Sequence, residues 1–180
     1  DAIIITHPKF AEQSNRLAKH RSAQGWKVAV VSVLDIYKEF YAGEKSPFAI
    51  RKFLQFANQK WPKPAPAYLT LMGDASWDPR KNLSGSVNED YVPSYGSPTS
   101  DFWYTLLDGD DYLNEMVVGR LPVNTVEEAT AVVDKLIEYD SLPASPWLKN
   151  FMFLSAKGFE SHVGYVEDFI LFPPICGDTL

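Results

Sequence analysis

Acidic residues gather in two stretches of the chain that could together hold a metal ion. Asp74 directly follows a run of apolar residues typical of a buried strand, and Asp111, Leu113 and Glu115 alternate along a later stretch. In an extended chain every second residue points to the same side, so these three positions face one way. If the strand that follows them neighbours the strand before Asp74, then Asp74 faces that side too. Carboxylates and nearby carbonyls then form an all-oxygen cage, which suits Ca²⁺ better than Zn²⁺.

The same carboxylates also allow a simpler interpretation. Acidic turns are far commoner than metal sites, and the spacing differs from that of an EF-hand loop. In this interpretation the stretch is a solvated turn, and Asp74 caps a nearby backbone group. The residues alone leave both possibilities open.

Arg120 and a short aromatic run lie close to these carboxylates in the sequence. Arg120 could bind a ligand carboxylate through two parallel hydrogen bonds. We favour a structural ion pair with Asp74 or Asp101. The aromatic residues 102–104 either bind a ligand or cover the edge of the sheet.

Nucleophilic catalysis has few candidates in this chain. His162 and Cys176 are the residue types of a base and nucleophile pair, but Cys176 is flanked by prolines and a glycine in a stretch without clear periodicity. His7 ends an apolar run and is interpreted as a turn residue. The sequence contains no glycine-rich phosphate loop, zinc-ligand cluster or nucleophile elbow.

The order of apolar runs and amphipathic stretches indicates an α/β fold. Strands that alternate with helices imply right-handed crossovers and a three-layer, open, mostly parallel sheet flanked by helices. A long connection precedes the fourth strand, and long connections in compact domains are usually functional. The strands are predicted at residues 2–6, 27–33, 67–72, 116–118 and 151–155. One helix is predicted at residues 8–24, a second begins at Ser46 and Pro47, and a third follows a Thr125–Glu128 capping box. The long connection is predicted at residues 75–112.

Composition narrows the possible partners. The chain has 180 residues, 46% of them hydrophobic, and a net charge of −6. The acidic balance and the lack of a basic run argue against nucleic acid binding. No apolar run is long enough to span a bilayer. Asp1 has the character of a processed or cut terminus, and the single cysteine leaves the cellular compartment open.

Several motifs together resemble one family of enzymes. They are Ile3–Phe10, Leu71–Ser76, Tyr91–Pro93, Ser97–Tyr104, Asp108–Tyr112 and Gly119–Val123, followed by Glu127–Ala129 and Val133–Lys135. With these motifs the chain resembles the amino-terminal half of the catalytic domain of gingipain-type cysteine peptidases, peptidase family C25, which have a caspase-like fold. The resemblance implies a first subdomain over residues 1–149. Residues 150–180 would then begin an incomplete second subdomain, which is the catalytic one.

The resemblance also implies roles for particular residues. The catalytic histidine of the family lies in a His-Gly segment of the second subdomain, and its cysteine follows farther on. Neither motif occurs here, so we assign no catalytic residue to this chain. The family carries calcium, and its ligands would correspond to the side chains of Asp74, Asp111 and Glu115 and the backbone carbonyls of Asp108 and Leu113.

The function implied is part of a secreted or bacterial cell-surface cysteine endopeptidase. Its partners would be a protein or peptide substrate and the remainder of the catalytic domain. Two alternatives stay open: a sorting transpeptidase of an outer-membrane secretion system, and a scaffold or binding module without catalytic activity.

Overall fold

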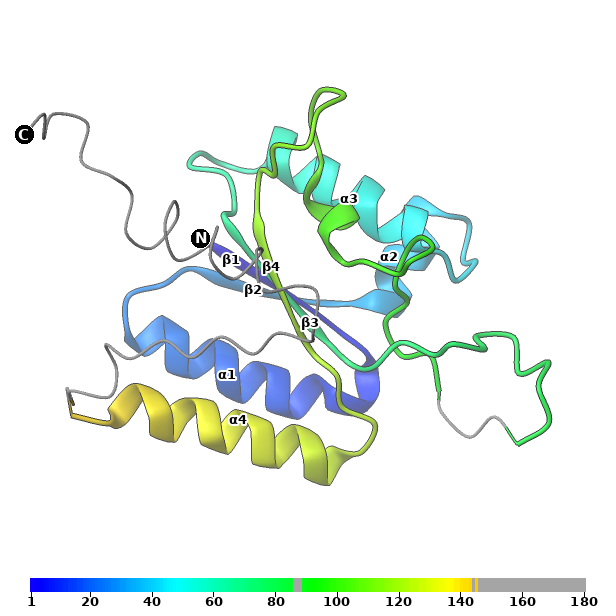
Figure 1. Cartoon of the computed structure of the whole chain (residues 1–180). Helices are drawn as coiled ribbons and strands as arrows, with labels where there is room; N and C mark the ends of the chain where they lie inside the picture. Colours follow the sequence, from blue (N-terminus) through cyan, green and yellow to red (C-terminus); the bar gives the residue numbers. More distant parts are fainter. Residues whose placement is uncertain (86–88, 144, 146–180) are drawn as a thin grey trace, which may run out of the picture. The chain divides into compact units, whose positions relative to one another are not determined.

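A parallel sheet organises the first compact unit of the chain, Asp1–Ser141. The computed structural model describes residues 1–85, 89–143 and 145. The strands are β1 (Ala2–Thr6), β2 (Val28–Ser32), β3 (Tyr68–Met72) and β4 (Val117–Leu121), and they lie in the order β2-β1-β3-β4. All neighbouring pairs run parallel, with Ala2 opposite both Val28 and Tyr68. Their carboxyl ends therefore meet at one edge of the sheet (Figure 1).

Helices cover both faces of this sheet (Figure 1). One face packs against α1 (Ala11–Ala23) and α4 (Val126–Ser141), around Ile4 and Met72. The other face packs against α2 (Val33–Phe40), α3 (Pro47–Lys60) and the short 3-10 helix η2 (Phe102–Thr105), around Ile3, Ile5 and Leu71. The alternation of β1 side chains between the two cores follows from the two-residue period of a strand. The predicted three-layer α/β fold is confirmed.

The structure corrects three local predictions. Helix α2 was not predicted, although Val33, Ile36, Tyr37 and Phe40 follow the helical spacing i, i+3, i+4, i+7. Strand β4 is longer than residues 116–118 and includes Arg120. The predicted first helix is divided into a 3-10 turn, η1 (Pro8–Phe10), and α1.

Two further predictions concern residues that the structure does not describe. The predicted strand at 151–155 and the boundary between residues 149 and 150 fall where the structure gives no description.

Ser46 accepts a hydrogen bond from the Phe48 amide and begins α3 as predicted. Within the described part of the chain, no helix is long and apolar enough to cross a membrane.

A capping box begins α4, as the sequence predicts. Thr125 Oγ1 accepts a hydrogen bond from the Glu128 amide at 3.1 Å, and the Glu128 carboxylate accepts one from the Thr125 amide at 3.2 Å. We expect Thr125→Ala to lower the free energy of unfolding by about 1 kcal/mol, because an orphaned amide of the first turn loses its acceptor. Thr130→Ala, in the same helix, is the control, since the Thr130 hydroxyl donates to the Val126 carbonyl and caps no amide of the first turn. Equal losses in urea denaturation would contradict the capping role.

Candidate functional site at the carboxyl edge

Open α/β sheets place their sites outside the carboxyl ends of the strands, where the strand order reverses. In this sheet that point lies between β1 and β3, since β2 lies on one side of β1 and β3 on the other. The chain leaves β1 through His7 and leaves β3 through Gly73 and Asp74. This edge is therefore the first place to look for a site.

Tyr91 fills the crevice between β1 and β3. A Cβ atom at Gly73, whose φ is +134°, would lie 2.8 Å from the Tyr91 Cβ, so only glycine allows this approach. The Tyr91 ring packs edge-on against Phe10 at 4.9 Å between centroids, and its hydroxyl accepts a hydrogen bond from Lys9 Nζ at 2.7 Å. The usual ligand position is thus occupied by the protein itself. Tyr91 lies in the Tyr91–Pro93 motif of the sequence, but no periodic spacing around it predicts this packing role.

His7 is a structural residue of the same edge. Its Nδ1 accepts a hydrogen bond from the Lys9 amide at 3.2 Å, which caps η1. Burial, followed by the charges of Lys45 and Lys9, lowers the pKa of His7 below its ordinary value, so the ring is neutral at pH 7. The interpretation of His7 as a turn residue agrees with this geometry.

Arg120 holds the long connection against the end of the sheet. Its Nε and Nη2 donate to the two carboxylate oxygens of Asp101, each at 2.7 Å. Its Nη1 donates to the carbonyls of Gly73 and Val92, both at 2.7 Å, and Nη2 also donates to the carbonyl of Pro93 at 3.2 Å. The predicted structural ion pair is therefore made with Asp101. Asp74 instead accepts a hydrogen bond from the side-chain amide of Asn124.

The aromatic run 102–104 belongs mainly to the packing. Tyr104 is fully buried, and its hydroxyl donates to the Pro93 carbonyl at 2.6 Å. Trp103 stacks on Tyr95 with 3.7 Å between ring centroids. Phe102 is 40% exposed. Of the two interpretations of this run, coverage of the sheet describes Tyr104 and Trp103.

A cleft of about 320 Å³ opens beside the Arg120–Asp101 pair. Residues from the ends of β3 and from the long connection line it, among them Asp74, Ser76, Trp77, Asp90, Ser94 and Asp101. Trp77 is 89% exposed, so its indole is available for contact. The Asp90 carboxylate is almost fully buried and lies 3.0 Å from Lys45 Nζ. Our sequence analysis missed Trp77 and Asp90, because isolated residues in a loop carry no periodic signal.

The proposed calcium ligands do not come together in one place. β3 and β4 are neighbours, as required, but they run parallel. The Asp74 amide bonds to the Val123 carbonyl beyond the end of β4, whereas Glu115 precedes the start of β4. The length of β4, roughly 13 Å, therefore separates the two. The prediction that Asp74 faces the same side as Asp111 and Glu115 is wrong, because the approach to a parallel strand lies at the opposite edge.

The loop carboxylates bond to nearby backbone amides. Asp108 accepts from the Gly109 amide, Asp111 from the Leu113 amide and Glu115 from the Leu107 amide. Over residues 1–85 and 89–143, no group of three or more His, Cys, Asp or Glu side chains is close enough to hold a metal ion. Each carboxylate keeps a second oxygen whose chemistry suits Ca²⁺.

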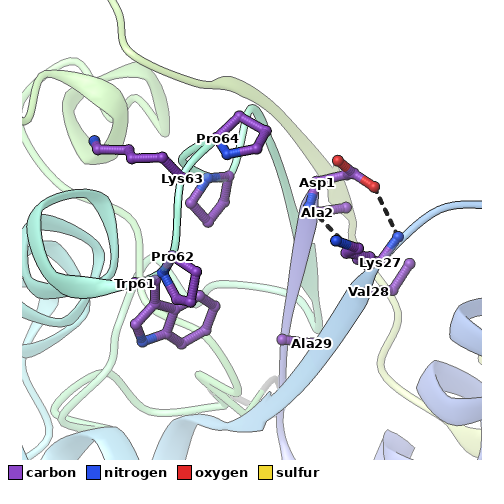
Figure 2. Close-up of a pocket in the computed structure, with 10 residues that line it drawn as sticks. Asp1, Ala2, Lys27, Val28, Ala29, Trp61, Pro62, Lys63 and Pro64 are labelled. Carbon is purple, nitrogen blue, oxygen red and sulfur yellow. Dashed lines mark hydrogen bonds between the residues drawn. The ribbon is translucent and has the colours of Figure 1, made fainter.

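A further hollow, of about 320 Å³, lies at the opposite, amino-terminal edge (Figure 2). Figure 2 shows Trp61, Pro62 and Pro64 facing the start of β1 across this hollow. The Asp1 amine donates to the Lys27 carbonyl, and the Asp1 carboxylate accepts from the Lys27 amide. Both polar groups of Asp1 are thus engaged with the backbone of the neighbouring strand, and the hollow offers mainly packing surface.

Comparison with protein families identifies the class of this chain. A model described as peptidase family C25 matches residues 1–172. The chain therefore belongs to peptidase family C25, a family of cysteine peptidases, and the resemblance inferred from the motifs is confirmed. No curated protein matches the sequence.

Solved structures of larger proteins share the fold. Dimeric latent PorU from Porphyromonas gingivalis is 25% identical, with a TM-score of 0.63 over 92% of this chain and 18% of PorU. The complex of the pro- and mature domains of RgpB from Porphyromonas gingivalis is 23% identical, with a TM-score of 0.61 over 77% of this chain and 28% of that chain. The Arg-specific cysteine proteinase gingipain R (RgpB) is 22% identical, with the same TM-score and the same coverage. The chain thus spans less than a third of each of these structures.

The Arg120–Asp101 pair predicts a pH dependence of stability. Burial alone would raise the pKa of Asp101, but hydrogen bonds from Arg120 and Ser94 and the charge of Arg120 bring it below the ordinary value of 3.8. A pKa that is lower in the folded state stabilises the fold above that ordinary value, and the contribution disappears as pH falls through the folded-state pKa.

We expect Asp101→Asn to lower the free energy of unfolding by about 2–3 kcal/mol at pH 7, because the partly buried Arg120 loses its counter-ion. Below about pH 4 the difference from the unmodified protein should shrink, since the Asp101 carboxyl of the unfolded chain takes up a proton there while the folded one, with its lower pKa, is still ionised. Guanidinium denaturation between pH 3 and pH 7 measures both values. A difference that stays constant across this range would show that the ion pair does not stabilise the fold.

Proposed function

We propose that this chain forms the amino-terminal subdomain of a secreted or cell-surface C25 cysteine endopeptidase. The observation that carries the proposal is the built carboxyl edge, where Arg120 fixes the long connection beside an open cleft. Clefts at this edge are where α/β folds bind ligands. Exposed Trp77 and the neighbouring carboxylates suit contact with an extended peptide. Family membership supports peptide-bond chemistry for the parent protein.

In this proposal the catalytic histidine and cysteine come from sequence outside this chain. The described residues contain no cysteine, and His162 and Cys176 lie outside them. In the complete enzyme, a histidine-paired thiolate would attack the scissile carbonyl and expel the amine, and water would then release the acyl group. The described subdomain would contribute one wall of the cleft and the sheet that supports it.

The position of α4 supports a separate second subdomain. Helix α1 leads from β1 to β2, and α4 packs on the same face of the sheet beside α1. A right-handed crossover through that face leads from β4 back toward β3, where the positions are already taken. In our proposal a parallel strand after α4 belongs to a second sheet, that of the catalytic subdomain. The outer edge of β4, where Val117 is 60% exposed, would then be free to face the remainder of the catalytic domain.

The peptidase proposal is tested by comparing this chain with its full-length parent. We expect the parent to cleave fluorescent casein and to lose activity with iodoacetamide, whereas the 180-residue chain alone shows no cleavage. The parent with Cys176→Ala is the control and should keep its activity. Inactivity of that variant would place the nucleophile in this chain. Transfer of the acyl group to added hydroxylamine in preference to water, followed by mass spectrometry, would indicate the transpeptidase alternative.

We also propose that the loop before β4 binds calcium without Asp74. Asp111 and Glu115 would supply carboxylate oxygens, and Asp108 and Leu113 their backbone carbonyls. The chemistry of these donors is the support, since hard oxygen ligands suit Ca²⁺. The ion would neutralise part of the acidic loop and hold it at the start of β4.

Thermal unfolding with excess calcium and with a chelator tests this site. At saturating metal we expect a stabilisation of about 2–4 kcal/mol, because only the folded loop binds the ion. Asp111→Ala should abolish the effect, and Asp74→Asn should leave it intact. Loss of the effect in Asp74→Asn would instead support one calcium site that includes Asp74, which the parallel arrangement of β3 and β4 argues against. The absence of any calcium effect would remove the site altogether.

A further inference from the structure

Helix α3 carries apolar side chains on two faces. Its inner face is buried in the core by Ala49, Ile50, Phe53, Leu54 and Ala57. On its outer side, Phe48 and Phe56 are 44% and 46% exposed. A helix that is apolar on both sides is normally covered on both, and grouped exposed aromatic residues mark interaction surfaces.

Phe48, Lys52 and Phe56 form a single row on this outer side, which we call the α3 ridge. They follow one another at intervals of four residues, and such rows pack into the grooves of a second helix. Aromatic neighbours support both ends of the ridge. Phe48 contacts Trp103 at 5.3 Å between centroids, and Phe56 contacts Phe40 at 5.7 Å. The ridge is therefore a firm surface and not a set of loose side chains.

The charge of α3 indicates the character of the missing partner. The helix contains Arg51, Lys52 and Lys60 and no acidic residue, in a chain whose net charge is −6. Arg51 is directed away from the ridge, toward the Leu106 carbonyl. Lys52 Nζ lies 5.1 Å from the centroid of the Tyr41 ring, and among the described residues it forms no ion pair. A cation between two exposed phenylalanines is complementary to a carboxylate between two apolar side chains.

We propose that the α3 ridge is a docking surface for an acidic amphipathic helix of a protein partner. The partner would place a Glu or Asp opposite Lys52, and apolar side chains at four-residue spacing opposite Phe48 and Phe56. A second copy of this chain does not fit, because a symmetric pairing of two ridges sets Lys52 against Lys52. The proposal is independent of the peptidase function, since the ridge does not include the carboxyl-edge cleft.

Two synthetic peptides and a charge reversal test the proposal on the intact chain. One alanine-rich helical peptide carries Leu, Glu and Leu at four-residue spacing, and the other carries Lys in place of Glu. We expect the Glu peptide to bind about tenfold more tightly in fluorescence titrations, through the pair with Lys52. Lys52→Glu should reverse this preference, and Phe56→Ser should weaken both peptides. Lys19→Glu, an equal charge change on exposed Lys19 of α1, is the matched control and should change neither.

Three outcomes would overturn the proposal. They are equal binding of the two peptides, no binding of either, and the same response to Lys52→Glu and Lys19→Glu. Vesicles of phosphatidylcholine and phosphatidylglycerol provide the competing test. Vesicle binding that Lys52→Glu abolishes, without binding of either peptide, would assign the ridge to a lipid surface instead. Unchanged thermal unfolding of Lys52→Glu would show that the reversed preference arises at the surface.

Discussion

The guanidinium group of Arg120 is the interaction on which the carboxyl edge depends. Five hydrogen bonds connect it to the Asp101 carboxylate and to three carbonyls, at Gly73, Val92 and Pro93. A largely buried cation of this kind is stable only when its N–H donors find acceptors. The long connection supplies most of those acceptors. The need of Arg120 in β4 for hydrogen-bond acceptors therefore determines where the connection lies, and with it the shape of the cleft.

The parallel arrangement of the strands imposes a second constraint. All carboxyl ends share one edge, so residues that follow the strands gather there and residues that precede them gather at the other edge. Asp74 and Tyr91 belong to the first group, and Asp111 and Glu115 belong to the second. This division separates the candidate peptide cleft from the acidic loop. It also means that a ligand at either site would stabilise a different part of the sheet.

Much of the fold could be predicted from the sequence because its signals are local. Ser46 and the Thr125–Glu128 pair mark helix starts through hydrogen bonds between residues two or three apart. Helix α2 carried an equally local signal that our prediction did not use. The pairing of Arg120 with Asp101 was one of two alternatives, and the sequence could not choose between them. Only the path of the long connection brings Asp101, and not Asp74, to the guanidinium group.

By itself the sequence determined the fold class, the family and the residue types available for chemistry. These follow from short-range periodicity, from helix caps and from motifs that can be recognised in the sequence alone. The tertiary structure alone decided that Tyr91 fills the crevice at Gly73 and that the carboxylates divide between two edges. The reason is physical: strand direction and register connect residues that are distant in sequence, and no local pattern records the edge at which a side chain lies.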